Sequence, residues 1–459
     1  MLTKPREWIY LPRHADLARL FDAVRDMECL SVVGVSNLGK SATLRALCDT
    51  QVQAQYLGSD ATDYLFVYID FNHMLVMSEH AFYELVLRAT IEAIRAQKVN
   101  GEVLRQLEAA YTSLIAPSNA FEIPLRFAQG MAAIGDQLKQ KVVFLFDEVD
   151  GPVAGIDGRV FLNLRALRDR HQDGLTYVTA TNRRLEQVRQ DPDVAEFVEL
   201  FERQVLYLSM LEAEQVRQLA ARYAHEEGIT FSEDDMTFIR LWSGGHPALL
   251  ETTCRILGML TGKPQRDPSQ DSIIHRRATE VMAQDLNVLG ECRKIWNDLT
   301  EPERDALLAV AAGSENLRGP GYDGIVAKHL VIVSGAEPKI FSRSFAEFVG
   351  RQNVARRPAG AQVFRVDPES GEVWVNGQKI PELTNLEYRL LLLLYGRMGK
   401  IVSKYDVVEA VWGEGYIDDV DDARIEKLIS RLRQKIEPDP ANPKHLHTVR
   451  GRGYKLAES

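Results

Sequence analysis

The stretch Val32-Val33-Gly34-Val35-Ser36-Asn37-Leu38-Gly39-Lys40-Ser41 decides the fold of the first half of the chain. It has the pattern G-x-x-x-x-G-K-S, which predicts a phosphate-binding loop. The two glycines let the backbone curl and turn its N–H groups inward towards an anion. Residues 29–33 before the loop form an apolar strand candidate, and residues 41–47 form a helix whose N-terminus would face the phosphates. A chance glycine-rich turn is the alternative, and both flanks argue against it.

The loop predicts a binding site for ATP or ADP with Mg²⁺. The ammonium of Lys40 is expected to reach the outer phosphates, and the hydroxyl of Ser41 is expected to ligate the metal. The predicted nucleotide-binding residues are Gly34, Val35, Ser36, Asn37, Leu38, Gly39, Lys40, Ser41 and Ala42.

A second apolar run, residues 141–146, ends in the carboxylates Asp147 and Glu148. A central parallel strand with a site at its C-terminal end has this composition. Asp147 is placed to hold Mg²⁺ through water, and Glu148 to orient or deprotonate an attacking water. An acidic turn after a strand is common by itself, so the pairing with the loop carries the functional interpretation.

A polar residue at the end of the strand candidate 175–182 is expected to touch the γ-phosphate. Asn182 is the first candidate and Thr181 the second, while Arg183 and Arg184 are weaker ones. With the candidates 64–70 and 204–208, the strands alternate with helices at 79–97, 119–139 and 160–171, which predicts a parallel α/β sheet over residues 1–210. Residues 211–288 show helical patterns only and are predicted to form a lid.

The last third of the chain contains a weak internal repeat. Thr300-x-x-Glu303 and Thr384-x-x-Glu387 are both capping boxes that open an apolar helix. Because such boxes are common, coincidence is the alternative. We predict a middle helix-turn-helix module at 289–353, a linker at 354–361, and a C-terminal module at 362–459.

The C-terminal module contains a basic helix and a basic hairpin. Residues 423–457 have nine Lys or Arg and three Asp or Glu, which gives 9 − 3 = +6 in a chain whose net charge is −10. A helix in the major groove with a wing in the minor groove has this layout, and a solvated basic helix is the alternative. The predicted DNA-binding residues are Arg424, Lys427, Arg431, Arg433, Lys435 and Arg450.

Net charge, cysteine spacing and the distribution of apolar residues limit the class of protein. A net charge of −10 does not favour nucleic acid, so a basic surface must be local. The four cysteines have no C-x-x-C pairing, which favours a reducing compartment. No signal-peptide region and no apolar run of membrane length is evident, so we expect a cytoplasmic protein without membrane contact.

Residues 1–290 resemble the AAA-related P-loop ATPases of the STAND class, signal-transduction ATPases with numerous domains, and their archaeal relatives. The matching pieces are Gly34–Ser41, Phe146-Asp147-Glu148, Thr179–Asn182 and Gly245-His246-Pro247. The resemblance implies that Pro12-Arg13, where the family has a G-R pair, lines the base pocket through Arg13. It also implies that Pro247 is a contact from the lid to the nucleotide, and that residues 289–352 form a winged helix.

The final hundred residues resemble the OmpR/PhoB-type winged helix. The matching motifs are Leu383-Thr384-x-x-Glu387, Val411-Trp412-Gly413, residues 429–433 and residues 448–454. The resemblance implies that Arg424, Lys427 and Arg431 face the major groove or its phosphates, and that Arg450 enters the minor groove.

The combination predicts a transcription regulator whose C-terminal winged helix is switched by a slow STAND-like ATPase. Double-stranded DNA is the predicted partner, with RNA polymerase or a signalling protein and a nucleotide-dependent homo-oligomer as further candidates. An alternative is a DNA-anchored AAA-type ATPase acting in replication initiation, mobile-element maintenance or defence. A scaffold that does not hydrolyse nucleotide is a third hypothesis, which Glu148 disfavours.

Overall fold

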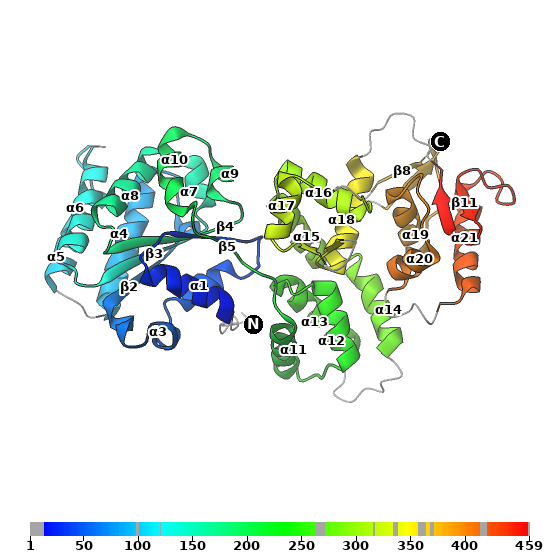
Figure 1. The fold of residues 1–459 in the computed structure, drawn as a ribbon, viewed down its shortest axis with the longest axis horizontal. Helices are drawn as coiled ribbons and strands as arrows, with labels where there is room; N and C mark the ends of the chain where they lie inside the picture. Colours follow the sequence, from blue (N-terminus) through cyan, green and yellow to red (C-terminus); the bar gives the residue numbers. More distant parts are fainter. Residues whose placement is uncertain are drawn as a thin grey trace. The chain divides into compact units, whose positions relative to one another are not determined.

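The computed structural model describes residues 13–97, 101–119, 121–261, 271–314, 317–333, 338–356, 364–367, 371–413 and 420–457. The chain divides into two compact units, Met1–Met210 and Leu211–Ser459 (Figure 1). Pro12 and residues 357–361 of the predicted linker lie outside the described residues. The first three linker residues, 354–356, lie in a helix instead.

The first unit is built on a parallel sheet of five strands in the order β2-β3-β4-β1-β5. This arrangement, with the predicted phosphate-binding loop directly after β1, resembles a P-loop ATPase fold and confirms the predicted parallel α/β fold class. The strands are β1 (Leu30–Val33), β2 (Tyr64–Asp70), β3 (Lys141–Asp147), β4 (Leu175–Thr181) and β5 (Val205–Tyr207). Because β1 lies between β4 and β5, the loop after it lies at the carboxyl edge of the sheet beside the end of β4.

Helices cover both faces of this sheet. They are α1 (His14–Arg25), α2 (Lys40–Ala46), α3 (Thr50–Leu57), α4 (Glu79–Gln97), α5 (Gly101–Ile115), α6 (Glu122–Gln137), α7 (Asp150–Gly155), α8 (Arg159–Arg170), α9 (Leu185–Val188) and α10 (Pro192–Val198), with 3₁₀ turns at Gly58–Asp63, Phe71–His73 and Glu199–Phe201. The helices predicted at 79–97, 119–139 and 160–171 are confirmed with small shifts of their ends, whereas α5 was not predicted.

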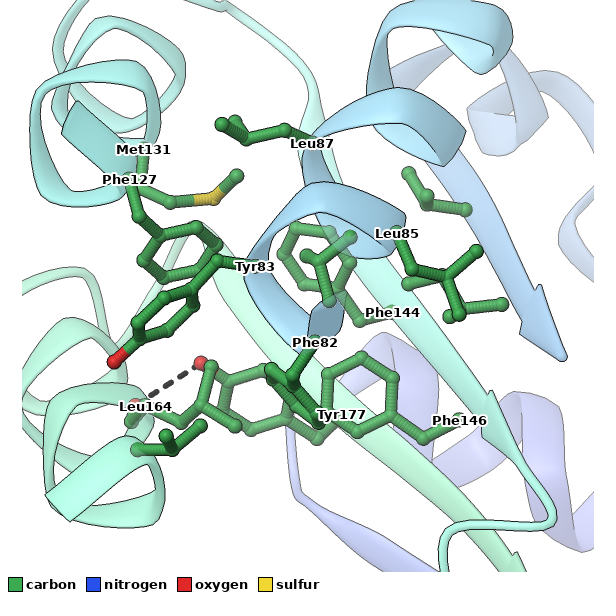
Figure 2. Packing of buried hydrophobic residues seen from close by; sticks show 14 of the residues in the cluster. Phe82, Tyr83, Leu85, Leu87, Phe127, Met131, Phe144, Phe146, Leu164 and Tyr177 are labelled. Carbon is green, nitrogen blue, oxygen red and sulfur yellow. Dashed lines mark hydrogen bonds between the residues drawn. The ribbon is translucent and has the colours of Figure 1, made fainter. Parts of the chain in front are cut away.

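An aromatic core joins one face of the sheet to α4, α6 and α8 (Figure 2). Phe82 of α4 packs edge-on against Phe146 of β3, with ring centroids 6.2 Å apart. Tyr177 of β4 is fully buried, and its hydroxyl donates a hydrogen bond to the carbonyl of Leu164 at 3.0 Å. Large aromatic residues bury much apolar area, so this face contributes strongly to the stability of the unit.

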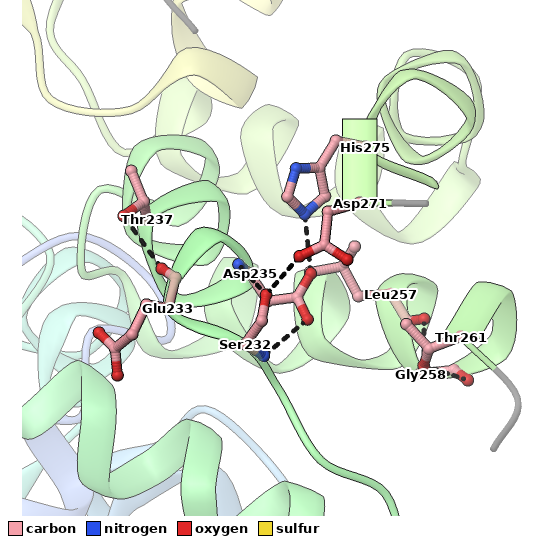
Figure 3. Close-up of polar contacts among 9 residues, drawn as sticks. All are labelled: Ser232, Glu233, Asp235, Thr237, Leu257, Gly258, Thr261, Asp271 and His275. Carbon is pink, nitrogen blue, oxygen red and sulfur yellow. Dashed lines mark hydrogen bonds and ion pairs between the residues drawn. The ribbon is translucent and has the colours of Figure 1, made fainter. Parts of the chain in front are cut away.

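The described residues at the start of the second unit form helices only, as predicted: α11 (Ala213–Glu227), α12 (Glu233–Ser243), α13 (Pro247–Thr261), α14 (Asp271–Met282) and α15 (Leu286–Asn297). Ser232 caps α12 and its hydroxyl donates to Asp271 at the start of α14 at 2.7 Å (Figure 3). Nε2 of His275 lies 2.7 Å from the buried Asp235, which ties the same two helices together. The boundary predicted at 288/289 falls inside α15.

The middle segment contains α16 (Glu301–Ala311), α17 (Pro320–Ala327), the antiparallel pair β6 (Val331–Ile332) and β7 (Lys339–Ile340), and α18 (Arg343–Arg356). The C-terminal segment has an antiparallel sheet of β8 (Phe364–Val366), β9 (Val373–Val375) and β10 (Gln378–Lys379), then α19 (Asn385–Gly396), α20 (Lys404–Val411), α21 (Asp422–Ile436) and the hairpin of β11 (Leu446–Val449) and β12 (Gly453–Leu456). Three helices with this hairpin form the predicted winged helix, and both predicted capping boxes are present.

Candidate nucleotide site and nucleic-acid interface

The phosphate-binding loop has a backbone that depends on its glycines. Gly39 has a φ of +102°, a left-handed conformation that glycine adopts without steric cost. A Cβ on Gly34 would lie 3.1 Å from Cδ2 of Leu38 and 3.4 Å from Cβ of Leu208. The loop therefore closes tightly over β1 before α2 begins at Lys40.

The Lys40 ammonium is the centre of the site. It is buried and donates to the carbonyls of Gly34 at 2.9 Å and Val35 at 3.3 Å. It also donates to Oδ1 of Asn182 at 2.6 Å, so the structure brings together the residues predicted at the ends of β1 and β4. Asp150 accepts a hydrogen bond from the Asn182 backbone at 3.1 Å and supports that position.

Asp147 offers one carboxylate oxygen that fits a metal. Its Oδ2 accepts a hydrogen bond from the Tyr68 hydroxyl at 2.5 Å, across the β2–β3 pair. Its Oδ1 is buried and has no hydrogen-bond partner among the described residues. Buried carboxylate oxygens are normally satisfied, and an oxygen ligand is what Mg²⁺ prefers. The Asp147 carboxylate therefore fits a metal ligand, and the role of Ser41, the second residue of α2, stays a prediction.

Glu148 follows β3 in a left-handed conformation, with a φ of +56°. Such a backbone is uncommon for a residue with a side chain, and strained residues cluster at functional sites. Burial raises the pKa of the Glu148 carboxyl above its ordinary value, the Lys40 charge lowers it, and the Asp147 carboxylate raises it further. A carboxylate with a raised pKa is better matched to accepting a proton near neutral pH.

Arg13 supports the loop. Its guanidinium is buried and donates to the carbonyl of Leu38 at 2.8 Å and to that of Ser209 at 2.6 Å, and it pairs with Asp16 at 3.3 Å. Burial lowers the pKa of Arg13, and Asp16 opposes this effect. The base-pocket role of Arg13 stays a prediction. Pro247 is the first residue of α13 in the second unit, and its nucleotide contact also stays a prediction.

The C-terminal segment presents one charged face of α21. Ile425, Leu428, Ile429, Leu432 and Ile436 are buried against the core of the domain. Arg424, Lys427 and Arg431 are exposed, at a spacing of three and four residues that places them on one side of the helix.

Two of the predicted DNA-binding residues also make contacts within the domain, and their DNA contacts stay predictions. Arg433 donates to the Leu446 carbonyl at 2.9 Å and to the Thr448 hydroxyl at 2.8 Å, which ties α21 to the wing. Lys435 donates to Oε2 of Glu387 at 2.7 Å, at the start of α19. These contacts join helices and strands far apart in sequence, so the sequence pattern gave no signal for them.

The close packing of the wing depends on Gly453, the first residue of β12. Gly453 has a φ of +131°, and a Cβ there would lie 2.0 Å from the carbonyl oxygen of Val402. The hairpin thereby packs closely on the chain between α19 and α20, and Tyr454 pairs with Val402. Arg450 and Arg452 are exposed at the turn.

Known proteins match the domain that contains this second candidate site. Residues 377–456 match the family "Transcriptional regulatory protein, C terminal". The chain is 44% identical over 92 residues to the sensory transduction protein RegX3 of Mycolicibacterium smegmatis, a match that covers 20% of this chain and 39% of RegX3. The chain thus spans about two fifths of the length of this curated relative.

Two solved structures are similar over different parts of the chain. The Walker-type ATPase PABY2304 of Pyrococcus abyssi has 12% identity and a TM-score of 0.48, with 76% of this chain and 98% of that chain covered. The RstA DNA-binding domain of Klebsiella pneumoniae, in complex with the RstA box, has 27% identity and a TM-score of 0.19, with 21% of this chain and 93% of that chain covered.

The fold and the two sites define a parallel α/β unit with a phosphate-binding loop, followed by a winged-helix domain. The C-terminal domain is of the OmpR/PhoB type found in transcriptional regulatory proteins. Among the helices in the described part of the chain, none is long and apolar enough to cross a membrane.

Proposed function

We propose that this protein is a cytoplasmic transcription regulator in which ATP binding and hydrolysis control a winged helix bound to double-stranded DNA. One observation carries the proposal. A phosphate-binding loop with an Asp147 oxygen that has no hydrogen-bond partner among the described residues, and an exposed cationic face on α21, occur in one chain. The proposed domains are an ATPase core at 1–210, a helical lid at 211–288, a middle winged helix at 289–353 and the DNA-binding domain at 362–459.

In the nucleotide site each residue has a distinct task. The backbone N–H groups of residues 34–42 would bind the phosphates. The Lys40 ammonium would exchange its present acceptors, the Gly34 carbonyl and Asn182, for oxygens of the outer phosphates. Ser41 and Asp147 would hold Mg²⁺. When bound, ATP and Mg²⁺ supply the scissile phosphoanhydride bond and the cation that neutralises its charge.

Glu148 would orient the attacking water and accept its proton. Its raised pKa sets the direction of the pH dependence: the carboxylate is lost as pH falls, at a higher pH than for an ordinary glutamate, whose pKa is about 4.3. Turnover is therefore expected to fall on the acid side of neutral. A pH profile of kcat checks this, and an acid limb at or below the ordinary glutamate value would contradict it.

On DNA, α21 would enter the major groove with Arg424, Lys427 and Arg431, and Arg450 would approach the minor groove from the wing. Arg433 and Lys435 would act indirectly by fixing the wing and α19 relative to α21. RNA polymerase or a signalling protein, and a nucleotide-dependent homo-oligomer, belong to the same proposal as further partners.

A second candidate is a DNA-anchored ATPase acting in replication initiation, mobile-element maintenance or defence. The observation in its favour is that Asp147 and Glu148 complete a hydrolytic set, which a switch driven by nucleotide exchange alone does not need. The regulator is preferred because the C-terminal domain is of a type found in transcriptional regulatory proteins.

The proposal is tested by mass spectrometry of the nucleotide that co-purifies with the chain, beside a genomic map of its DNA binding. The wild type should carry ADP or ATP and map to sites upstream of genes. Lys40→Ala should lose the nucleotide, and Glu148→Gln should keep it while losing most turnover. Unchanged nucleotide affinity in Lys40→Ala would refute the site, and a map without discrete sites, with turnover stimulated by any DNA, would favour the anchored ATPase.

A further inference from the structure

Within the second unit, a buried arginine lies at the seam between the C-terminal domain and the helices before it. Arg389 of α19 is only 8% exposed. Its Nη2 donates to the carbonyl of Thr279 in α14 at 3.1 Å, and its Nη1 to that of Val411 at the end of α20 at 3.4 Å. One guanidinium therefore joins the DNA-binding domain to the lid.

A carboxylate of α18 lies between two such guanidiniums. Oε1 of Glu347 is 3.6 Å from Nη2 of Arg389 and 3.3 Å from Nε of Arg343. Arg343 also donates to the carbonyl of Ala410 in α20 at 3.0 Å and lies over the Trp242 ring of α12, 5.1 Å from its centroid. We name Arg343, Glu347 and Arg389 the clasp.

The clasp lies in a seam whose polar groups are not all satisfied. Nε of Arg389, Nε of Arg351 and the hydroxyl of Tyr388 are buried and have no hydrogen-bond partner among the described residues. Burial lowers the pKa of Arg389, Glu347 opposes this, and the charges of Arg343 and Arg351 add to the lowering. Because water would satisfy these groups on separation, the seam has the character of a releasable domain contact rather than of a core.

The lid turn beside the predicted nucleotide contact packs directly on the start of α18. Gly244 and Gly245 both have positive φ, and a Cβ on Gly244 would lie 2.2 Å from the carbonyl oxygen of Phe341, two residues before Arg343. The N–H of Leu211, the first residue of the second unit, donates to the Gly245 carbonyl at 2.9 Å. The turn and the start of α18 are packed so closely that a displacement of the turn also displaces α18.

The clasp does not cover the recognition face. In the clasped arrangement Arg424, Lys427 and Arg431 of α21 remain exposed. The contacts of the clasp go to α14, α18 and the end of α20 instead. Closure of the clasp therefore orients the DNA-binding domain without blocking it.

We propose that the clasp couples the winged helix to the lid, so that the recognition helix moves with α18 when the lid moves. This inference rests on the proposed function for the origin of the motion, whereas the clasp itself is tested without nucleotide. Breaking the clasp should leave DNA binding and ATP turnover in place and remove the dependence of one on the other.

The first experiment measures the clasp directly in the full chain without nucleotide. Arg389→Met and Glu347→Gln are compared with Arg240→Met, which removes an exposed charge from α12. Hydrogen exchange of the amides in α18, α19 and the end of α20 should rise by about tenfold or more in the clasp variants. Small-angle scattering should show a larger radius of gyration in the same variants. Exchange and dimensions equal to those of Arg240→Met would overturn the clasp.

The second experiment measures coupling. DNA is titrated into the clasp variants loaded with ADP and, in the Glu148→Gln background, with ATP. The ratio of DNA affinities in the two states should fall from about 5- to 150-fold in the parent to about onefold. A ratio that survives opening of the clasp would overturn its coupling role, as would a loss of DNA affinity in every state. If the parent shows no ratio, the proposed function fails, and the exchange experiment still decides whether the clasp exists.

Discussion

The middle segment and the C-terminal segment begin with the same local structure and end with different surfaces. In each, a Thr-x-x-Glu capping box opens a helix, at Thr300 and at Thr384. In each, the capping glutamate also binds a lysine from a later part of the segment. Glu303 lies 2.9 Å from the Lys328 ammonium, and Glu387 lies 2.7 Å from that of Lys435.

A later helix in each segment differs in exposed charge. α17, at Pro320–Ala327, contains no Lys or Arg and packs so closely on α16 that a Cβ on Gly321 would lie 2.2 Å from the Pro302 carbonyl oxygen. α21 presents three exposed cations on one side. A shared helical scaffold is therefore a poor indicator of nucleic-acid binding, and exposed positive charge on one helix is a better one.

The largest expected effect follows from that contrast. Replacement of Arg424, Lys427 and Arg431 by alanine should abolish measurable DNA binding, since each such contact is worth about 1–3 kcal/mol. The matched control replaces the exposed Arg293, Lys294 and Arg318 of the middle segment and should leave affinity unchanged. Fluorescence anisotropy with a selected genomic fragment measures both. Equal losses would show that the middle segment also binds DNA.

The two capping pairs should differ in their effect on stability. Glu303 and Lys328 have side chains only 3% and 2% exposed, so Lys328→Met leaves a buried carboxylate without its partner. The free energy of unfolding of the second unit should fall by about 3–5 kcal/mol. Chemical denaturation monitored by circular dichroism measures the loss. A smaller loss of unfolding free energy in Lys328→Met than in Lys435→Met would contradict this prediction.

Lys435→Met should cost less, about 1–2 kcal/mol, because the Lys435 side chain is 24% exposed and partly screened by water. Burial alone would raise the pKa of Glu387, but the hydrogen bonds from Lys435 and the Thr384 backbone lower it. The stabilisation from the Glu387–Lys435 pair is therefore fully present above the ordinary glutamate pKa of about 4.3. It is lost as the pH falls through the lowered pKa of Glu387 in the folded protein. Denaturation at pH 7 and at pH 3 should show a smaller acid loss in the variant, and equal losses would contradict the pairing.

The smallest effect is expected at the wing. Arg450 is exposed at the β11–β12 turn, and a minor-groove contact there would add affinity with little base selection. Arg450→Ala should reduce the slope of log affinity against log salt by about 1. Arg452→Ala is the neighbouring comparison at the same turn. An unchanged slope in both variants would remove the wing from the interface.

Much of this organisation could be predicted from the sequence, because local patterns dictate it. Strand β2, Tyr64–Asp70, was predicted to the residue, and the phosphate-binding loop lies where its pattern indicates. Helix α5 was missed although Val103, Leu107 and Leu114 are buried at helical spacing, so the signal was present.

Contacts between distant segments could not be predicted. The hydrogen bond from Tyr68 to Asp147 depends on strand register, and the engagement of Arg433 and Lys435 depends on where the wing and α19 pack. Charge counting along the chain cannot separate a lysine that faces DNA from one that holds two helices together. The clasp at Arg389 was hidden for the same reason, since its partners come from α14, α18 and α20.

The most direct test of nucleotide control is a thermodynamic cycle on one chain. Labelled DNA is titrated into protein loaded with ADP, into Glu148→Gln loaded with ATP, and into nucleotide-free protein, and nucleotide affinity is then measured with and without DNA. We expect DNA affinities to differ by about 1–3 kcal/mol between states, with the same factor in the reverse direction, as linkage requires. Three superimposable DNA titrations, with the same particle mass in each state, would contradict nucleotide control and would favour the DNA-anchored ATPase.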